Sequence, residues 1–476
     1  MNRTLILAGT LLALFLPAAV FAHASPVDMQ PGTGQRMPTA PSEISIRFSE
    51  RLEPGSSRIR VTDPSGAQVQ GGSATVDSDG YTLRVPVRNA DGVYTVAWSV
   101  VSRDDGHFTR GSYAYSVGSD IAPLAASEEV VQIATTQEAI YMFVEFLGNS
   151  ILWGSLALYI LSGDTRARRI FVWLALAAAV FGFTGAAGQL FLKTYQLAAL
   201  HETGLREAFH LYRHTSAGIS TLVRLIALSS AGVLAAVFGF RRVRTTVILL
   251  GVPLFVFAYF RAIVSHASAN PFYPELSIAV NVVHVIEKDL WLGSLVVLCV
   301  LMVSRVRESV VPQITGRVIA MLSANLAVLT VTAGYIIWLH LKSFSNVTTT
   351  NWGQVFVPLL TSAIFLVALH VYHVVMYRVR PQFAQKYFAP TIGAQAAAAA
   401  LVVFFTSIVI ITSPPSHTAT QELMARDGVT VITLSRAPYE DGMVALSIRG
   451  ADGIPTVFIG PREGGLLPAL EKRYEG

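Results

Sequence analysis

Residues 92–118 read GVYTVAWSVVSRDDGHFTRGSYAYSVG, two runs of alternating apolar and polar residues on either side of the polar segment SRDDGH. Alternation with a period of two is typical of half-buried strands. Three similar runs lie upstream, EISIRFSE (43–50), SSRIRVTDP (56–64) and YTLRVPV (81–87), separated by Pro, Gly and Asp clusters. Short strands at this spacing predict a small all-β, immunoglobulin-like sandwich over residues 23–125.

The segment before the predicted sandwich has the features of a secretory signal peptide over residues 1–22. It holds Arg3, an apolar run from Leu5 to Leu16 and the small-residue site Val20-Phe21-Ala22. Cleavage there makes His23 the first residue of the mature chain. A second site, Ala22-His23-Ala24, would instead start the chain at Ser25, and this alternative stays open. Either cleavage places the sandwich outside the inner membrane.

After a linker at 126–138, residues 139–412 are predicted to form an all-α transmembrane bundle. The whole chain is 52% hydrophobic and only 14% charged, which excludes a conventional cytosolic enzyme. Eight apolar stretches are long enough to cross a bilayer as helices. They are 139–161, 170–192, 215–239, 246–264, 277–303, 316–341, 354–377 and 389–412.

The distribution of positive charge predicts the orientation of these helices. With the sandwich outside, the four cytoplasmic connections contain Arg166, Arg168, Arg169, Arg241, Arg242, Arg244, Arg305, Arg307, Arg317, Arg378, Arg380 and Lys386. The external connections contain Lys193, Arg206, Arg213 and Lys342. This asymmetry follows the positive-inside rule. It also explains the net charge of +5 without a nucleic-acid partner, because the cationic excess lies in the membrane region.

The last segment, 413–476, is polar again and is predicted to be a short β-rich extension. GVTVITLS (428–435) and MVALSIRG (443–450) alternate around the turn Asp441-Gly442. An even number of spans puts this extension on the same side as the sandwich. About 60 residues are few for an independent domain.

All eleven histidines avoid the predicted cytoplasmic connections. They are His23, His107, His201, His210, His214, His266, His284, His340, His370, His373 and His417. This bias indicates a soft or borderline cation handled from outside, although interfacial imidazoles are common without any ligand. The single cysteine, Cys299, excludes a disulfide framework and is expected to be a small packing residue.

A candidate metal site combines His23 with Asp105 and His107. A mature N-terminal histidine offers its amine and an imidazole nitrogen to one ion, and a D-x-H pair on an extended segment places a carboxylate and an imidazole on one side. Nitrogens with one oxygen in a plane suit Cu(II) better than zinc or calcium. The competing interpretation is that Asp104-Asp105-Gly106 is only a turn and His107 a surface residue.

Polar residues within the predicted spans give a second set of candidates. His284 and Glu287 are three residues apart, hence on one helix face, and they precede Lys288 and Asp289. Glu145 and Arg224 are candidate partners, because buried charges in a membrane pair or line a cavity. His266 and His340 lie at outer helix ends, so a cation path is one interpretation. A salt-bridge cluster of Glu145, Arg224, Glu287, Lys288 and Asp289 that merely locks the bundle is the other.

Two further histidines, His370 and His373, lie three residues apart in the inner half of the seventh span. They suggest either an exit site for copper or ligands of a haem. Two histidines on one helix cannot bind opposite faces of one haem, so each would need a partner on another helix.

The first domain resembles the periplasmic copper-binding CopC family. The resemblance rests on HASPVDMQPGTG after the signal, EISIRFSERLEPG, and above all SRDDGHFTRGSYAYSVG, and it covers residues 23–118. It implies a Cu(II) site at His23, Asp105 and His107. The methionine-rich loop that binds Cu(I) in some members is missing, because only Met29 and Met37 occur in this domain.

The membrane half resembles the CopD family of copper-resistance proteins over about residues 140–412. SHASANPFYPELSIAVNVVHVIEKDLWLGSLVVL (265–298) and TAGYIIWLHLKSFSNVTTTNWGQVF (332–356) carry this resemblance. Two positions depart from the family pattern. The usual lysine early in the seventh span is replaced near Val357-Pro358, and an Asn-Arg pair at its inner end is replaced around His370 and His373.

These observations predict a bacterial inner-membrane copper protein that is not an enzyme. It is expected to capture Cu(II) in the periplasm and to transport copper inward, with Cu(I) as the alternative cargo of the membrane part. Its expected partners are copper ions, the lipid bilayer and other periplasmic copper proteins. No nucleotide-binding motif is present, so transport would be passive or ion-coupled. The alternatives are a membrane-anchored copper chaperone and a haem-dependent cupric reductase.

Overall fold

The structure is a computed structural model that describes most of the chain from residue 24 to residue 412 and four strands beyond it. Within 24–412 the residues outside the description are 89, 119–128, 133–135, 164–166, 269–272, 305–306, 342–343, 345 and 380. The signal segment and His23 also lie outside the described residues.

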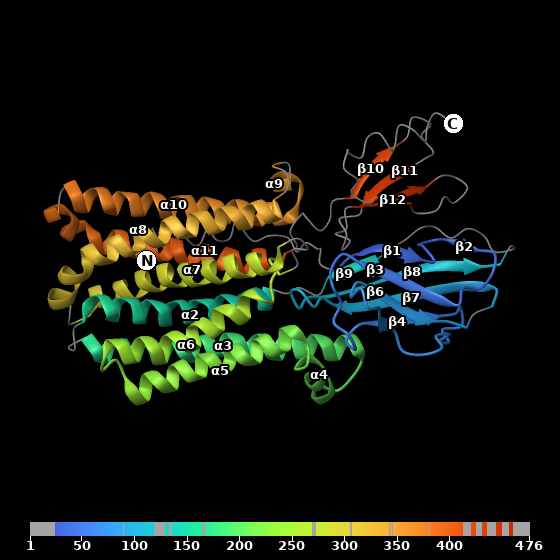
Figure 1. The fold of residues 1–476 in the computed structure, drawn as a ribbon, viewed down its shortest axis with the longest axis horizontal. Helices are drawn as coiled ribbons and strands as arrows, with labels where there is room; N and C mark the ends of the chain where they lie inside the picture. Colours follow the sequence, from blue (N-terminus) through green and yellow to red (C-terminus); the bar gives the residue numbers. More distant parts are fainter. Residues whose placement is uncertain are drawn as a thin grey trace, which may run out of the picture.

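Two sheets packed face to face form the N-terminal sandwich (Figure 1). One sheet has the order β1 (Pro26–Gln30), β3 (Glu43–Phe48), β6 (Thr82–Pro86), β5 (Thr75–Val76). The other has the order β2 (Arg36–Met37), β8 (Phe108–Val117), β7 (Gly92–Val101), β4 (Arg58–Thr62). All five runs predicted as strands are present. Strand β9 (Glu129–Gln132) pairs with β8 inside the segment expected to be a linker.

The core of the sandwich follows from the alternation. The inward positions of β3 are Ile44, Ile46 and Phe48, all buried, and Phe48 meets Trp98 of β7 edge to face at 5.1 Å between ring centroids. Burying alternate apolar residues of two sheets against each other is the main stabilising term of such a domain.

Each of the eight predicted apolar stretches forms a helix. They are α2 (Thr136–Ser162), α3 (Arg168–His201), α5 (Ser216–Phe238), α6 (Val243–Ala262), α7 (Pro274–Val303), α8 (Arg307–His340), α10 (Asn351–Val379) and α11 (Pro381–Ile410). Two short helices, α4 (Leu205–Tyr212) and α9 (Asn346–Thr349), interrupt connections that we expected to be loops.

Seven of these eight helices are long and apolar enough to cross a membrane. The exception, α7, has three consecutive charged residues in its middle, Glu287, Lys288 and Asp289. It packs between α2, α8, α6 and α11, and its charged stretch faces those neighbours: Lys288 and Asp289 are buried. A central helix shielded by others tolerates charges that a lipid-facing helix does not.

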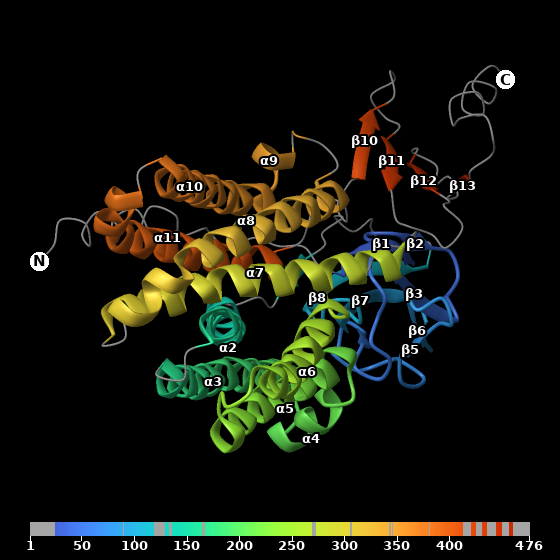
Figure 2. The same cartoon turned by 60° about the vertical axis from the view of Figure 1, so that its left-hand side comes forward.

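The sandwich stands at one end of the bundle, and the arginine-rich connections α2–α3, α5–α6, α7–α8 and α10–α11 lie at the other end (Figure 1). Figure 2 shows α7 running between α2 and α8 along the length of the bundle. The C-terminal strands β10 (Thr420–Met424), β11 (Val431–Ser435), β12 (Val444–Arg449) and β13 (Val457–Ile459) form an antiparallel sheet in chain order. The prediction of a β-rich extension is confirmed for these strands.

One apolar cluster fixes the sandwich on the bundle. Val101 and Phe108, at the ends of β7 and β8, are fully buried against residues of α3, α4, α5 and the start of the α6–α7 connection: Leu197, Ala198, Ala208, Tyr212, Ala217 and Val264. Polar contacts flank it. The main-chain nitrogen of Ser216 donates to Glu53 (3.2 Å), and the Ser268 hydroxyl donates to the main-chain oxygen of Asp104 (3.3 Å). The turn between β7 and β8 is therefore pressed onto the helices.

Candidate metal centre

The turn between β7 and β8 gives its two adjacent aspartates different tasks. Buried Asp104 accepts hydrogen bonds from Arg51, through the guanidinium Nε (2.8 Å) and the main-chain nitrogen (3.1 Å). The turn itself is closed by a bond from Gly106 N to the oxygen of Ser102 (3.0 Å). Asp104 thus ties the turn to the sandwich, whereas Asp105 faces the helices.

Gly106 is required at this turn for two reasons. Its φ of +75° lies in the left-handed region that favours glycine, and a Cβ there would come within 2.3 Å of the Cβ of Ala217 in α5. Any larger residue would push the turn away from the bundle.

Asp105 and His107 are adjacent in space, but not because they lie on a strand. The expectation of an extended D-x-H segment is wrong, because the residues sit in a tight turn before β8 begins at Phe108. Asp105 Oδ1 accepts from the main-chain nitrogen of His107 (2.9 Å), and Oδ2 lies 3.0 Å from His107 Nδ1. A turn in which an aspartate bonds the backbone two residues on produces this proximity.

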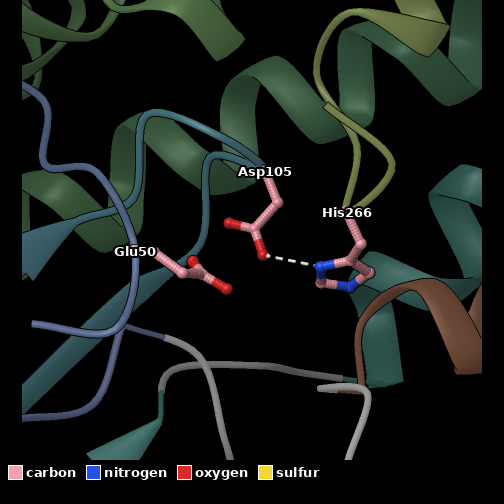
Figure 3. Close-up of side chains that lie close together, drawn as sticks. All are labelled: Glu50, Asp105 and His266. Atoms are coloured by element: carbon pink, nitrogen blue, oxygen red, sulfur yellow. Dashed lines mark ion pairs between the residues drawn. The ribbon is translucent and has the colours of Figure 1, made fainter. Parts of the chain in front are cut away.

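His266, from the connection between α6 and α7, joins the same carboxylate. Its Nδ1 lies 3.3 Å from Asp105 Oδ2, and its ring stacks on that of His107 with 6.2 Å between centroids. Glu50, just after β3, completes the group: one ligand atom each of Glu50, Asp105 and His266 lie within 4.8 Å of one another (Figure 3). The sandwich and the bundle therefore both contribute to one cluster of metal-ligating side chains.

The electrostatics of this cluster suit a cation. Burial raises the pKa of Glu50 well above its usual value, and the nearby Asp105 and Asp104 carboxylates raise it further. Burial lowers the pKa of His107, but the charge of Asp105, together with bonds to Asp105 and Glu138, raises it overall. Carboxylates that raise one another's pKa mark a place where a positive charge is stabilising.

The donor set itself fits Cu(II). Imidazole nitrogens and carboxylate oxygens are ligands that divalent copper accepts. His23 lies outside the described residues, but Ala24 next to it is fully buried and its backbone hydrogen-bonds to Glu50. The chain therefore enters the described structure beside this cluster.

Below His107, the pocket between the domains becomes cationic. His107 Nε2 lies 3.3 Å from Glu138 of α2, which also bonds the Lys193 ammonium of α3 at 2.7 Å. Arg224 and Arg261 line the same pocket farther into the bundle. Of these three cationic side chains, Lys193 and Arg224 are paired with the carboxylates of Glu138 and Glu145.

The predicted intramembrane histidines follow a different line, between α7, α8, α10 and α11. The rings of His266 and His340 are 6.0 Å apart. His284 Nδ1 lies 3.0 Å from the Thr332 hydroxyl, and Glu287 accepts a bond of 3.1 Å from Asn325 when that amide is oriented to donate. We call this series of polar side chains, with His370 and His373, the histidine ladder.

The lower end of the ladder has two separate hydrogen-bond sites. His370 Nε2 lies 3.0 Å from the Ser323 hydroxyl of α8. Both ring nitrogens of His373 are engaged by α11, with Gln395 at 2.9 Å and Thr391 at 2.8 Å. The two histidines therefore face different neighbouring helices.

The alternative interpretation, one salt-bridge cluster of all five residues, is wrong, since the structure divides them between two groups and the ladder. Arg224 bonds Glu145, which also accepts from Gln189 (2.5 Å). Lys288 bonds Asp289 (2.7 Å). Asp289 further accepts from Asn149 and Ser150 of α2, each at 2.6 Å. Glu287 belongs to neither group and lies on the ladder.

Sequence reasoning missed Glu50, Glu138 and Lys193 as neighbours of the site. The sequence could have indicated Glu50 as a candidate. It continues the inward positions 44, 46 and 48 of EISIRFSE and is an acid where an apolar residue is expected. The sequence around Glu138 and Lys193 does not indicate their place at the site, since that place depends on how the domains dock. Cys299 is half-buried and packs against the bundle core, as expected.

Comparison with known proteins places similarity in the N-terminal domain. The family model of the CopC domain matches residues 26–118. The "Copper transport protein CutJ" of Bacillus subtilis (strain 168) is 32% identical over 111 residues, 23% of this chain and 20% of CutJ, so the match spans a fifth of that relative. "Protein YobA" of Escherichia coli (strain K12) is 36% identical over 102 residues, 21% of this chain and 82% of YobA. The crystal structure of CopC from Methylosinus trichosporium OB3b aligns with 21% of this chain and 100% of its own, at 28% identity and a TM-score of 0.20.

Proposed function

Because the chain belongs to the CopC family through its N-terminal domain, we propose that this copper-related protein captures Cu(II) at the sandwich and passes copper through the helical bundle. The single observation that carries the proposal is the contact between the buried side chains of Asp105 and His107, beside buried Glu50, where the sandwich meets the helices. In this proposal the sandwich and the C-terminal extension lie in the periplasm, the bundle is a CopD-like unit in the inner membrane, and no reaction is catalysed.

The proposed ligands of the captured ion are His23, Asp105 and His107. Signal cleavage after Ala22 would give His23 a free amine and an imidazole nitrogen for one ion, next to Ala24, whose backbone bonds Glu50. Asp105 supplies an oxygen, and His107 a nitrogen. Copper supplies charge that compensates the buried carboxylates.

For the route through the membrane, we favour the histidine ladder over the pocket below His107. The ladder offers imidazole and hydroxyl groups and the carboxylate of Glu287. In the pocket, the carboxylates of Glu138 and Glu145 are already paired with Lys193 and Arg224, and Arg261 adds a further positive charge. The Glu145–Arg224 pair then joins α2 to α5, and the bonds from Asn149 and Ser150 to Asp289 join α2 to α7.

The transport step is tested by copper accumulation in cells that express the full chain. His284→Gln removes the imidazole near the middle of the ladder, and we expect accumulation to fall to the level of cells without the protein. His214→Gln, an exposed histidine between α4 and α5, is the matched control and should accumulate copper as the unchanged chain does.

Accumulation unaffected by His284→Gln, in a protein that still binds Cu(II), contradicts transport and leaves the membrane-anchored chaperone. The cupric reductase alternative requires a haem, so purified protein without a Soret band removes it.

A further inference from the structure

His266, a histidine of the helical region, contacts Asp105, a proposed copper ligand of the sandwich. It lies in the Ser265–Ser268 turn that follows α6. This turn is held from three sides: Ser265 bonds the main-chain oxygen of Ala262 (2.7 Å), Asn281 of α7 donates to Ser265 (3.0 Å), and Ser268 donates to Asp104 (3.3 Å). The imidazole is thus positioned by α6, α7 and the sandwich together.

The hydrogen bond on the far side of the ring fixes which nitrogen carries a proton. His266 Nε2 lies 3.1 Å from the main-chain oxygen of Ile410 at the end of α11. A carbonyl oxygen only accepts, so Nε2 is the N–H and, in the neutral ring, Nδ1 carries the lone pair. A backbone carbonyl behind the ring is the usual way of orienting a metal-binding histidine.

The Nδ1 atom is aimed at the cluster of carboxylates. It lies 3.3 Å from Asp105 Oδ2, the same oxygen that lies 3.0 Å from His107 Nδ1. The side chains of Asp105 and His266 are 3% and 10% exposed, and Glu50 is 1% exposed. Three donors that are buried and within 4.8 Å of one another need only small rotations to reach the ~2 Å ligand distances of a borderline divalent ion.

From this geometry we infer a second copper position, formed by Glu50, Asp105 and His266 and shared between the sandwich and the bundle. Asp105 belongs to both positions, so an ion moves from His107 to His266 by exchanging one imidazole for another while it keeps one carboxylate. The ring centroid of His340, the next histidine of the ladder, lies 6.0 Å from that of His266. The role as a transfer step rests on the proposed function, whereas the metal position itself does not.

The test is pulsed electron paramagnetic resonance of the full-length protein in detergent with one equivalent of Cu(II), which counts the imidazoles bound to the ion. To isolate the second position, it is done in a His23→Gln, His107→Gln background, which removes both imidazoles of the first position. We expect an imidazole coupling that His266→Gln removes, with at least a tenfold loss of Cu(II) affinity. His214→Gln in the same background is the matched control and keeps both.

The side chain of His266→Gln is long enough to keep a donor near Ile410. A second variant, His266→Asn, places an amide near the position of Nδ1 without an imidazole, so it checks the loss of the ligand independently. It should lose the same coupling with an unchanged unfolding temperature of the metal-free protein. An unchanged coupling and affinity in both His266 variants overturns the shared position. Copper accumulation with His284→Gln is a separate measurement. If that measurement contradicts transport while the His266 coupling is present, the proposed function is refuted and the shared metal position stands.

Discussion

At the scale of single residues, the neighbouring aspartates Asp104 and Asp105 have different roles in one turn: Asp104 holds the turn to the sandwich, and Asp105 is a candidate metal ligand. Asp104 is turned to Arg51 and Asp105 to the imidazoles of His107 and His266. Their side chains are about equally buried, so burial alone does not distinguish them. The difference lies in the partner, a fixed guanidinium in one case and titratable imidazoles in the other.

Asp105→Asn is predicted to weaken Cu(II) binding without destabilising the sandwich. The amide keeps the bond from the main-chain nitrogen of His107 but loses the negative charge, so we expect affinity to fall by about 10- to 100-fold. Isothermal titration of the full chain with a competing chelator measures this loss. Asp63→Asn, in an exposed turn, serves as the control and should bind as before. Equal affinity in the two variants argues against Asp105 as a ligand.

Asp104→Asn is predicted to have the opposite profile. The charged bonds with Arg51 are lost, so the sandwich should be less stable by about 1–3 kcal/mol. Its thermal unfolding midpoint in the metal-free protein should fall, whereas that of Asp105→Asn should not. Identical midpoints for the two variants would refute the separation of roles.

At the scale of elements, the contact between α2 and α7 depends on two glycines. A Cβ on Gly293 would lie 1.6 Å from the main-chain oxygen of Ser150, and one on Gly154 would lie 2.0 Å from the carbonyl carbon of Gly293. The close approach lets Asn149 and Ser150 bond Asp289. Two backbones this near each other form a rigid support for the middle of α7, where His284 and Glu287 of the ladder lie.

Gly293→Ala is therefore predicted to destabilise the bundle by about 1–3 kcal/mol, the usual cost of overpacking. The helices must separate, and the bonds to Asp289 lengthen. The unfolding midpoint in detergent should fall. Gly251→Ala in α6, where no heavy atom lies within 4 Å of an added Cβ, is the matched control and should unfold at or above the original midpoint. A midpoint of Gly293→Ala equal to that of the control contradicts this account.

Most elements were predictable because their patterns are local. A period of two along 43–50 and 92–118 defines strands, and apolar runs of about twenty residues define helices, without reference to distant residues. The turn at Asp105 was only the competing interpretation of the D-x-H segment, and the short helix α4 was not predicted. Their conformation depends on contacts between the sandwich and α5 and on the packing of Tyr212 beneath the sandwich.

At the scale of the whole molecule, docking of the sandwich on the bundle creates the site. Asp105 and His107 could be chosen from the D-G-H turn, but Glu50 and His266 are 216 positions apart in the chain and meet only because Val101 and Phe108 are buried against the helices. Sequence patterns within one domain do not predict a contact between side chains of two domains. The same limit applies to the ion pairs, because sequence spacing does not show that Glu145–Arg224 and Lys288–Asp289 are separate groups.

Phe108→Ala is predicted to loosen this docking by removing the largest apolar side chain of the interface cluster. Arg60 and Glu202, an exposed pair 3.4 Å apart across the interface, report on it. With both replaced by cysteine and Cys299→Ala as background, a short bismaleimide should link them rapidly, and Phe108→Ala should slow the linking several-fold. Val237→Ala, on an exposed face of α5, is the control. Equal linking rates would show that the cluster does not hold the domains together.

The direction of the ladder has an energetic consequence. From His266 beside the sandwich it leads to His370 and His373 in the C-terminal part of α10, the end of the bundle that holds the arginine-rich connections. With that end in the cytoplasm, a cation descending the ladder moves with the membrane potential, which contributes about 2.3 kcal/mol per elementary charge for each 100 mV. For Cu(I) this corresponds to an equilibrium accumulation of about fiftyfold, and for Cu(II) to the square of that factor. The voltage across the bilayer would then concentrate copper inside the cell with no consumption of nucleotide.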